Sequence, residues 1–373
     1  MLKRVPKFFR IAASRRCHTS GIAEENVNPE PSKGRVKDHW LFASPQYRGI
    51  NEFVKDIHNL VVFNNKNVLA LKKPAGLSCF KPKNEVVRYY NAAEFSFSLN
   101  DTLPGVKEMF GLEYLEIPVN LNSPYSGVVL LAKSPDVYKR LRNFYSISIK
   151  AQKLFVYKFW VITVGIPIPS AIEERVGVRR AEVEDHVVSV VLDNVSKQVL
   201  KIGGGIRPFI NMKTLSSNDE SGCALIEIQT TAFHWDVLEA YMSSRLTCIL
   251  GDHKYAPRVT TVLGEPVMKS YQKSPPETQE LPKQVLSRLK VRPDLQSDVP
   301  LHVHLQQQIL PRLKMPGRHY PQRIIEAEPP GIFRCTAQAL GLSIPEIKWT
   351  PPHIFKPVNK QVDTADPAIN IVT

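Results

Sequence analysis

The stretch of sequence that decides the fold reads Val119-Asn120-Leu121-Asn122-Ser123-Pro124-Tyr125-Ser126-Gly127 and continues into the apolar run Val128–Ala132. Asn-Ser-Pro is typical of a turn, because Asn and Ser side chains bond to nearby backbone groups. The apolar run predicts a buried strand. Ser134, Pro135 and Asp136 follow and predict the start of a helix, with a capping serine, a proline at the first helical position and an acid in the first turn.

Other segments show the periodicities of strands and helices. Apolar runs, several of them rich in β-branched and aromatic residues, predict strands at 68–71, 154–164, 225–228 and 301–305. Apolar residues with a period near 3.6 predict a helix at Trp235, Leu238, Met242 and Leu246. The region 168–224 is less regular, and we expect a polar loop at 216–221 within it.

Four of these segments, taken in order, resemble the RluA-type pseudouridine synthases. They are 68–77, which ends in Lys-Pro-x-Gly-Leu, the stretch around Asn122, the strand 155–165, and the segment that ends in Gly-Asp-x-x-Tyr at 251–255. The resemblance covers about residues 55–343. It implies an α+β fold with a mixed, mainly antiparallel central sheet and flanking helices.

The resemblance also implies where the site lies. The family has His-Arg-Leu-Asp, two variable residues and Thr-Ser-Gly. Alignment on Ser126 and Gly127 places the nucleophilic Asp of the family at Asn122 and its neighbouring Arg at Asn120. Substrate-binding residues are expected at Phe159, where the family has a base-stacking Tyr, and at Ser126, Gly127 and Lys73.

These replacements change the expected chemistry. Family enzymes flip a uridine out of the stack and attack it with a carboxylate, and they need no metal or organic cofactor. Asn122 is nearly isosteric with Asp, but its neutral amide is a poor nucleophile. Loss of the Arg at position 120 together with the Asp avoids a stranded charge. The resemblance therefore predicts a protein that binds RNA and whose catalysis is impaired or lost.

Two alternatives remain at this point. An active synthase could use another carboxylate, such as Asp101 or Asp136, on mitochondrial rRNA, mRNA or tRNA. Alternatively, the chain could be a structural, protein-interacting subunit of a mitochondrial ribonucleoprotein, with ribosomal or RNA-granule proteins as partners. We expect no metal site: His302 and His304 share one strand face and His319 lies nearby, but no Cys or acid completes a zinc set.

A fourth family feature is altered. Counting back from Gly251 without gaps, the Thr-Gly-Arg-x-His-Gln-x-Arg stretch of the family falls on residues 232–239. The apolar spacing of its helix is kept, whereas both arginines and the glutamine are gone.

The first 20 residues contain six Lys or Arg and no acid, interleaved with apolar residues, which is the composition of a mitochondrial presequence, or transit peptide. We therefore expect the mitochondrial matrix as location, a linker or arm at 21–50, a synthase-like domain at 51–343 and a tail at 344–373. Without the presequence, 43 basic and 35 acidic residues leave a charge of about +8, which suits RNA. The five scattered cysteines argue against a disulfide framework, and no apolar run is long enough to span a membrane.

Overall fold

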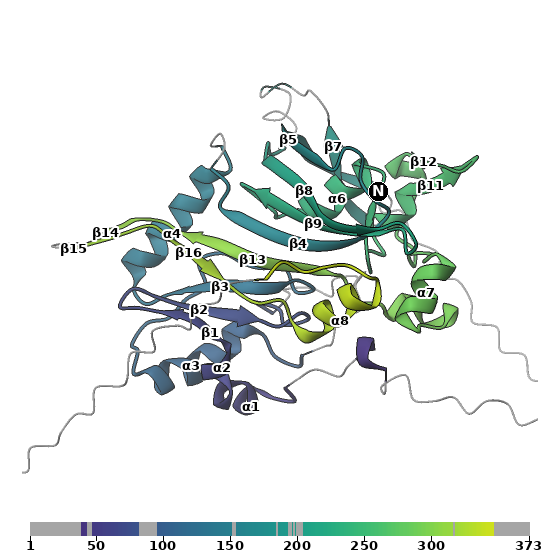
Figure 1. Ribbon diagram of the computed structural model, residues 1–373. Helices are drawn as coiled ribbons and strands as arrows, with labels where there is room; N and C mark the ends of the chain where they lie inside the picture. Colours follow the sequence, from purple (N-terminus) through teal and green to yellow (C-terminus); the bar gives the residue numbers. More distant parts are fainter. Residues whose placement is uncertain are drawn as a thin grey trace, which may run out of the picture. The chain divides into compact units, whose positions relative to one another are not determined.

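The computed structural model describes residues 39–42, 47–81, 95–150, 154–183, 186–192, 196, 198, 204–315 and 318–346 (Figure 1). All of them belong to one compact unit, Lys37–Thr373. The other unit, Met1–Val36, lies outside the described residues. So do the expected presequence and residues 347–373 of the expected tail.

The described part is built on a ten-stranded sheet. Eight strands follow the order β1-β2-β3-β13-β4-β9-β8-β5, while β10 pairs with β4 and β16 with β13. Among the described strands of this sheet, β3 and β13 pair in parallel and the other pairs are antiparallel. This topology confirms the predicted α+β fold with a mixed, mainly antiparallel sheet. The strands are β1 Val61–Asn64, β2 Val68–Lys73, β3 Ser126–Ala132, β4 Tyr157–Val164, β5 Ala171–Arg175, β8 Phe209–Asn218, β9 Cys223–Thr230, β10 Cys248–Ile249, β13 Val303–Leu310 and β16 Arg323–Glu326.

Helices and three small hairpins surround the sheet. Figure 1 shows α1–α3 at the β1–β2 end and α6 near β8, while the β11–β12 hairpin extends away from the sheet. The helices are α1 Ile50–Lys55, α2 Ile57–Leu60, α3 Leu99–Phe110, α4 Pro135–Ser148, α6 Val237–Ser244, α7 Lys283–Leu289 and α8 Gly331–Ala339, with 3-10 turns η2 Trp40–Phe42, η3 Ala256–Arg258, η4 Tyr271–Lys273 and η5 Pro293–Asp298. The hairpins pair β6 Gly177–Val183 with β7 His186–Leu192, β11 Val259–Val262 with β12 Glu265–Met268, and β14 Leu313–Met315 with β15 Arg318–Tyr320. No helix in the described ranges is long and apolar enough to cross a membrane.

Local sequence signals account for several of these boundaries. The helix expected after Ser134 is α4, and the Ser134 hydroxyl accepts a 3.3 Å hydrogen bond from the backbone N–H of Val137. The expectation of an irregular region at 168–224 was wrong, because this segment supplies strands β5, β6, β7 and β8. The expected loop at 216–221 begins inside β8, where Ser216–Asn218 pair with β9. Pairing with a neighbouring strand here outweighs the weak strand propensity of polar residues.

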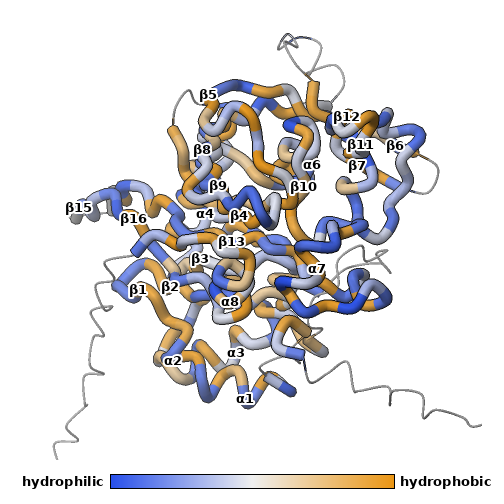
Figure 2. Tube along the Cα trace, turned by 45° about the vertical axis from the view of Figure 1, so that its right-hand side comes forward, coloured by the Kyte–Doolittle hydropathy of each residue, from blue (hydrophilic) through white to orange (hydrophobic). Residues whose placement is uncertain are grey.

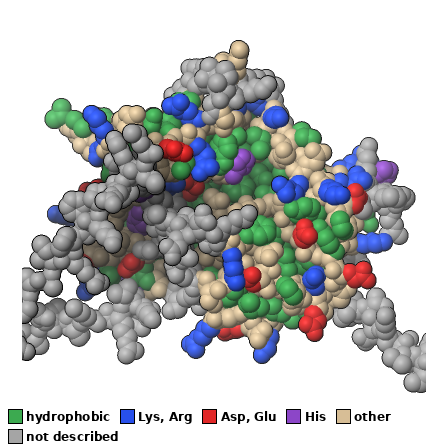
Figure 3. Space-filling view, turned by 180° about the vertical axis from the view of Figure 1, so that it is seen from behind, with side chains coloured by type: hydrophobic (Ala, Val, Ile, Leu, Met, Phe, Trp, Pro, Cys, Tyr) green, Lys and Arg blue, Asp and Glu red, His purple; other side chains and the backbone are tan. Residues whose placement is uncertain are grey.

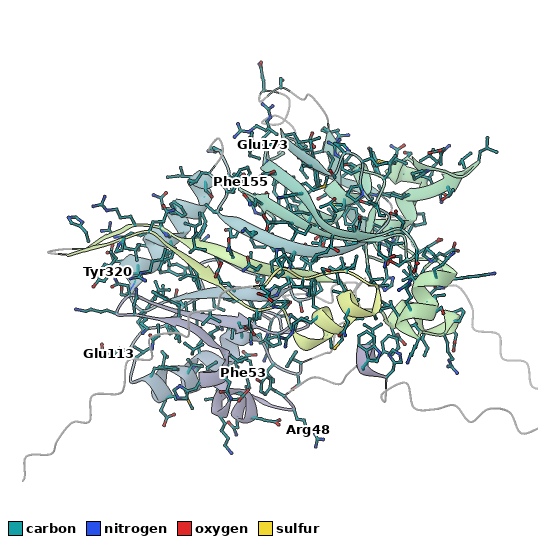
Figure 4. All side chains as sticks on the ribbon, in the orientation of Figure 1. Arg48, Phe53, Glu113, Phe155, Glu173 and Tyr320 are labelled. Carbon is teal, nitrogen blue, oxygen red and sulfur yellow. The ribbon has the colours of Figure 1, made fainter. Side chains whose placement is uncertain are left out.

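Two hydrophobic clusters cover the sheet, and β4 contributes to both. Phe159 and Val161 belong to the first cluster, whereas Trp160 and Ile162 belong to the second, as expected for side chains that alternate along a strand. Phe53 of α1 packs in the first cluster at the lower edge of Figure 4. Leu41, from the segment expected as a linker or arm, is buried in the second cluster with residues of α7 and α8. Figure 2 shows α1 and α2 carrying both hydrophobic and hydrophilic residues, as helices with one face on a core do.

Candidate active site

Asn122 lies in a short turn that leads into β3. The backbone N–H of Tyr125 donates a 3.1 Å hydrogen bond to the Asn122 carbonyl and closes this turn. Leu121 and Tyr125 are buried on either side, while Asn122 is partly buried and Asn120 is exposed. The buried side chains of Leu121 and Tyr125 therefore fix the turn, and the Asn122 amide between them stays partly exposed.

The side chain of Lys73 supports the Asn122 turn through hydrogen bonds. Its Nζ donates to the carbonyl oxygens of Tyr125 at 2.6 Å and Leu77 at 2.8 Å, and it lies 3.1 and 3.2 Å from those of Pro74 and Ser123. The side chain is almost fully buried, and burial lowers the pKa of Lys73 to about 8. The surrounding carbonyl oxygens favour its charged form. Lys73 was expected to contact substrate. In the structure its ammonium group instead bonds to backbone carbonyls of the Lys-Pro-x-Gly turn and the Asn122 turn.

Further hydrogen bonds join the Lys-Pro-x-Gly turn to the Asn122 turn. The Gly76 N–H donates to the Ser123 carbonyl at 2.8 Å, and the Ser123 hydroxyl donates back to the Gly76 carbonyl at 2.8 Å. The Cys79 thiol lies 3.5 Å from the Leu121 carbonyl. The Lys-Pro-x-Gly turn and the Asn122 turn, which lie far apart in the sequence, are thus joined by hydrogen bonds. We call the two joined turns the cradle.

Ser126 and Gly127 brace the parallel contact between β3 and β13. The Ser126 hydroxyl lies 2.9 Å from His304 Nδ1, and both side chains are buried. Gly127 has φ +129°, and a Cβ atom there would lie 2.2 Å from the Leu305 carbonyl oxygen. Both residues were expected to bind substrate, and the structure places both inside the sheet.

Phe159 was expected to stack on a base, and its side chain is 0% exposed. Its ring packs against the rings of Phe233 and Tyr125, with centroids 5.2 and 6.0 Å away. A base could reach this ring only if the protein rings around it moved.

Tyr125 connects Asn122 to a buried carboxyl on α6. The Tyr125 hydroxyl donates a 2.6 Å hydrogen bond to Glu239 Oε1. The same residue bonds to Asn122 through its backbone N–H, which donates to the Asn122 carbonyl at 3.1 Å. Burial and the neighbouring carboxyl raise the pKa of Tyr125 well above its ordinary value. Tyr125 therefore joins the backbone of the Asn122 turn to Glu239 on α6.

Sequence reasoning noted position 239 only as a lost arginine. The signal that could have identified it is its place on the apolar face of the helix, three residues before Met242 and four after Trp235. A lone acid on such a face needs a buried partner. Glu239 is 1% exposed, and its Oε2 atom is buried without a hydrogen-bond partner.

Other acids and a tyrosine surround Glu239. Burial, together with the nearby Asp236 and Asp252, raises the pKa of Glu239 well above its ordinary value. Asp236 accepts hydrogen bonds from Lys254 Nζ at 2.7 Å and the Tyr255 hydroxyl at 3.0 Å. Asp252 accepts from the backbone N–H groups of Lys254 and Tyr255, yet burial raises its pKa to about 7.

The loop before α6 has a strained backbone. Trp235 and Asp236 have φ values of +68° and +52°, in the left-handed region that non-glycine residues rarely occupy. The Ser189 hydroxyl donates to the Trp235 carbonyl, and Lys254 and Tyr255 hold Asp236. Such strain persists where the surrounding contacts over-determine it, and it is concentrated at functional sites.

The two carboxylates considered as alternative nucleophiles, Asp101 and Asp136, each lie in the first turn of a helix. Asp101 accepts from the Ser98 backbone N–H at 2.9 Å in the capping box of α3 and lies 3.4 Å from Lys81. Asp136, in the first turn of α4, pairs with Arg140 at 2.8 Å. The structure therefore does not bring either acid into the hydrogen-bonded chain around Asn122.

Two of the three histidines considered for zinc, His302 and His304, use both ring nitrogens within the protein. His302 bonds to the Pro300 carbonyl at 2.7 Å and the Thr336 hydroxyl at 2.9 Å. His304 bonds to Ser126 and, at 2.9 Å, to the Ala327 carbonyl. Burial lowers the pKa of each to about 4.

The face opposite to the view of Figure 1 is hollowed. Figure 3 shows hydrophobic side chains and a histidine in a hollow of this face, with several Lys or Arg side chains and, on one side, Asp or Glu side chains near its edge. An apolar hollow with cations near its edge suits a flat aromatic group attached to an anionic backbone.

Comparisons with known proteins agree with this architecture. The chain is 28% identical over 332 residues to mitochondrial mRNA pseudouridine synthase Rpusd3 of Mus musculus, covering 87% of this chain and 88% of the relative. It is 24% identical over 335 residues to mitochondrial pseudouridylate synthase RPUSD4 of Rattus norvegicus, covering 86% and 80%. The solved structure of human RNA pseudouridylate synthase domain containing 4 shares the fold, with a TM-score of 0.59 and 22% identity over 80% of this chain and 98% of that chain. No protein-family model matches the sequence.

Proposed function

We propose that this chain, a divergent member of the RluA-type pseudouridine synthase family, is a mitochondrial RNA-binding protein whose isomerase activity is impaired or lost. The observation that carries the proposal is the partly buried amide of Asn122, in the turn before β3, at the position that the resemblance assigns to the nucleophilic carboxylate of the family. An amide oxygen holds no full charge, so it can bind a base by hydrogen bonds but attacks a carbon poorly. The Tyr125 backbone N–H donates to the Asn122 carbonyl at 3.1 Å, which holds this turn in place.

The site residues divide into two groups under this proposal. Asn122 and the exposed Asn120 contact RNA. The residues of the second group are buried and position the Asn122 turn: Lys73, Ser126, Gly127 and Phe159. The hollow in Figure 3, with its hydrophobic side chains and the cations near its edge, offers a surface for an unstacked base and its phosphates.

We place the protein in the mitochondrial matrix. Both relatives carry the word mitochondrial in their names, and the acid-free, basic first 20 residues have the composition of a presequence. The mouse relative is named for mRNA, so mitochondrial RNA is the first ligand to test.

The test uses purified wild-type protein and the Asn122→Ala variant on total mitochondrial RNA. RNA retention is measured at about 50 and 200 mM salt, and pseudouridine is measured by mass spectrometry of the digested RNA. We expect binding to weaken at least about tenfold over that salt range, because phosphate contacts release counterions. We expect no more pseudouridine from wild type than from Asn122→Ala. Pseudouridine formation that depends on Asn122 would overturn the proposed loss of catalysis.

An active synthase is the second candidate, and the names of the relatives favour it, since both are called synthases. The same assay decides between the two. Activity that is unchanged in Asn122→Ala and lost in a variant of another carboxylate would establish this second function.

A third candidate, a protein-interacting subunit of a mitochondrial ribonucleoprotein, is favoured by the β11–β12 hairpin. At the tip of this hairpin, away from the sheet, the relative exposure of Val262 is 51% and that of Leu263 is 101%. Purification from mitochondria with and without RNase distinguishes the candidates. Ribosomal or granule proteins that stay bound after RNase treatment, and are released by a Leu263→Ser change, would support a protein interface.

A further inference from the structure

Residues 311–325 form a strongly basic segment around the β14–β15 hairpin. They contain four Lys or Arg and no Asp or Glu. The chain leaves β13 at Leu310, forms the hairpin and returns as β16, in which Arg323 is the register partner of Leu310. Arg312 and Arg323 are both exposed. Two exposed cations therefore lie close together where the hairpin leaves the sheet.

The base of the β14–β15 hairpin is held by the hydrophobic core. Leu313 is buried in the first hydrophobic cluster, and its register partner Tyr320 packs against that cluster. The guanidinium of Arg323 lies over the ring of Phe63 in β1, 5.9 Å from the ring centroid. Tyr320 lies near the left-hand end of the molecule in Figure 4. Because these contacts already order the hairpin, binding a ligand there costs less conformational entropy.

Helix α4 adds further cations at the same end of the sheet. The Tyr145 hydroxyl donates a 2.5 Å hydrogen bond to a carbonyl near the end of β13, and Figures 1 and 2 both show α4 close to the hairpin. Lys139 and Arg142 are exposed on this helix. Its one acid, Asp136, pairs with Arg140. We call four exposed side chains at this end the basic end surface: Lys139, Arg142, Arg312 and Arg323.

The basic end surface lies away from the Asn122 turn. The strands β3 and β13 are parallel, with His304 opposite Ser126, so both begin beside that turn. From His304, β13 continues for six residues to Leu310, which is about 20 Å at about 3.4 Å per residue. A ligand that reaches both places must be a polymer.

We infer that the basic end surface is a second RNA contact, which binds phosphates of nucleotides several positions away from the one at the Asn122 turn. The inference rests on the proposed function and extends it, because it names the part of the RNA that supplies affinity. Lys and Arg bind phosphates whatever the base is, so this surface holds single-stranded RNA without choosing its sequence.

The β11–β12 hairpin provides an internal comparison. It also extends away from the sheet (Figure 1), but residues 259–269 contain one Lys and one Glu, and its tip is apolar. A polyanion is attracted by excess positive charge and gains nothing from a neutral hairpin. The difference in charge therefore favours RNA at the β14–β15 hairpin and not at the β11–β12 hairpin.

The test measures binding of full-length wild type and of Arg312→Gln/Arg323→Gln to a labelled single-stranded RNA of about 20 nucleotides. Fluorescence anisotropy gives Kd between about 50 and 300 mM salt. Each phosphate contact contributes about 0.7 to the slope of log Kd against log salt, so we expect the slope to fall by about 1.4 in the variant. At about 100 mM salt its Kd should rise at least about fivefold. The α4 pair, Lys139→Gln/Arg142→Gln, should act in the same direction.

A matched control removes two exposed cations elsewhere. Lys269→Gln/Lys283→Gln has the same net charge as the arginine variant, but its positions lie on β12 and α7 at the other end of Figure 1. We expect its slope to change by less than about 0.3 and its Kd by less than about twofold. All three variants should melt within about 2 °C of wild type, because surface substitutions rarely affect stability. If the arginine variant melts earlier, the α4 pair decides.

Two results would overturn the inference: an unchanged salt slope in the arginine and α4 variants, or an equal loss in the control, which would show that net charge alone matters. It would also fail if these variants bound RNA normally and lost binding only to anionic lipid vesicles.

Failure of the proposed function is read separately. A wild type without salt-dependent RNA binding disproves the function itself. Pseudouridine formation that depends on Asn122 disproves the loss of catalysis and leaves the basic end surface standing. A wild type that binds RNA, beside an arginine variant that binds it equally well, leaves the function and ends the inference.

Discussion

The Tyr125 hydroxyl and the Glu239 carboxyl are joined by a 2.6 Å hydrogen bond across 114 residues of sequence, and both side chains are buried. This bond connects the turn that carries Asn122 to helix α6. The site is therefore determined jointly by two segments that come from opposite halves of the domain.

Removing the shared hydroxyl should destabilise the protein. Tyr125→Phe leaves the buried Glu239 Oε1 without its donor, so we expect a loss of about 1–3 kcal/mol in the free energy of unfolding. Urea denaturation measures it. Tyr138→Phe is the control, since its hydroxyl only accepts from Arg142 in an exposed pair and should change stability by less than about 0.5 kcal/mol. Equal effects in the two variants would contradict a special role for Tyr125.

Replacing Lys73 should loosen the Asn122 turn. Lys73→Met keeps the apolar stem but leaves the Leu77 and Tyr125 carbonyls without their donor, at an expected cost of about 2–4 kcal/mol. Lys73→Arg should not restore stability, because a planar guanidinium cannot replace a compact ammonium in a closed cradle. The exposed Lys139→Met serves as control. A Lys73→Met protein with wild-type stability and protease resistance would show that the cradle is not needed.

The contribution of Asp252 to the stability of the protein should fall as the pH rises towards neutrality. Burial raises the pKa of Asp252 from 3.8 to about 7, so the folded state holds its proton more tightly than the unfolded chain does. The stabilising effect is complete below the unfolded pKa and is lost as the pH rises through about 7. Asp252→Asn should remove this part of the pH dependence, which amounts to at most about 4 kcal/mol. Denaturation curves at pH 5, 6, 7 and 8 test it, and parallel pH profiles for the two proteins would contradict it.

Adding one methyl group at Gly127 should disrupt the parallel contact of β3 with β13. A Cβ atom there would lie 2.2 Å from the Leu305 carbonyl, in a backbone conformation that favours glycine. We expect Gly127→Ala to lose more than about 3 kcal/mol or to be recovered mostly as insoluble protein. Gly331→Ala, where the added atom meets nothing within 4 Å, should be close to neutral. The soluble fraction after expression and the unfolding midpoint of both variants provide the measurement.

Local patterns predicted much of the sheet and its helices. The apolar runs anticipated β2, β3, β4, β9 and β13, and the Ser-Pro-Asp signal located the start of α4. These features depend on neighbours within a few residues, so a single sequence contains them. The strands β5–β8 were missed because pairing with β9 and with one another, more than their own composition, keeps them extended.

The roles of the site residues could not be read in the same way. The family pattern pointed to Asn122 and Asn120, which the structure leaves at least partly exposed. It also pointed to Lys73, Ser126, Gly127 and Phe159, which the structure buries among carbonyls, strands and rings. Exposure depends on what other segments cover, and a motif does not include those segments.

The sequence by itself predicted a synthase-type α+β fold, a basic character and, at the position that the resemblance assigns to the carboxylate of the family, the amide of Asn122, because composition and motif order are properties of the chain. Only the tertiary structure decided that Tyr125 donates to Glu239 and that Lys73 donates to the carbonyls of Leu77 and Tyr125. Hydrogen bonds have direction and act over about 3 Å, so they exist only once the fold has brought distant segments together.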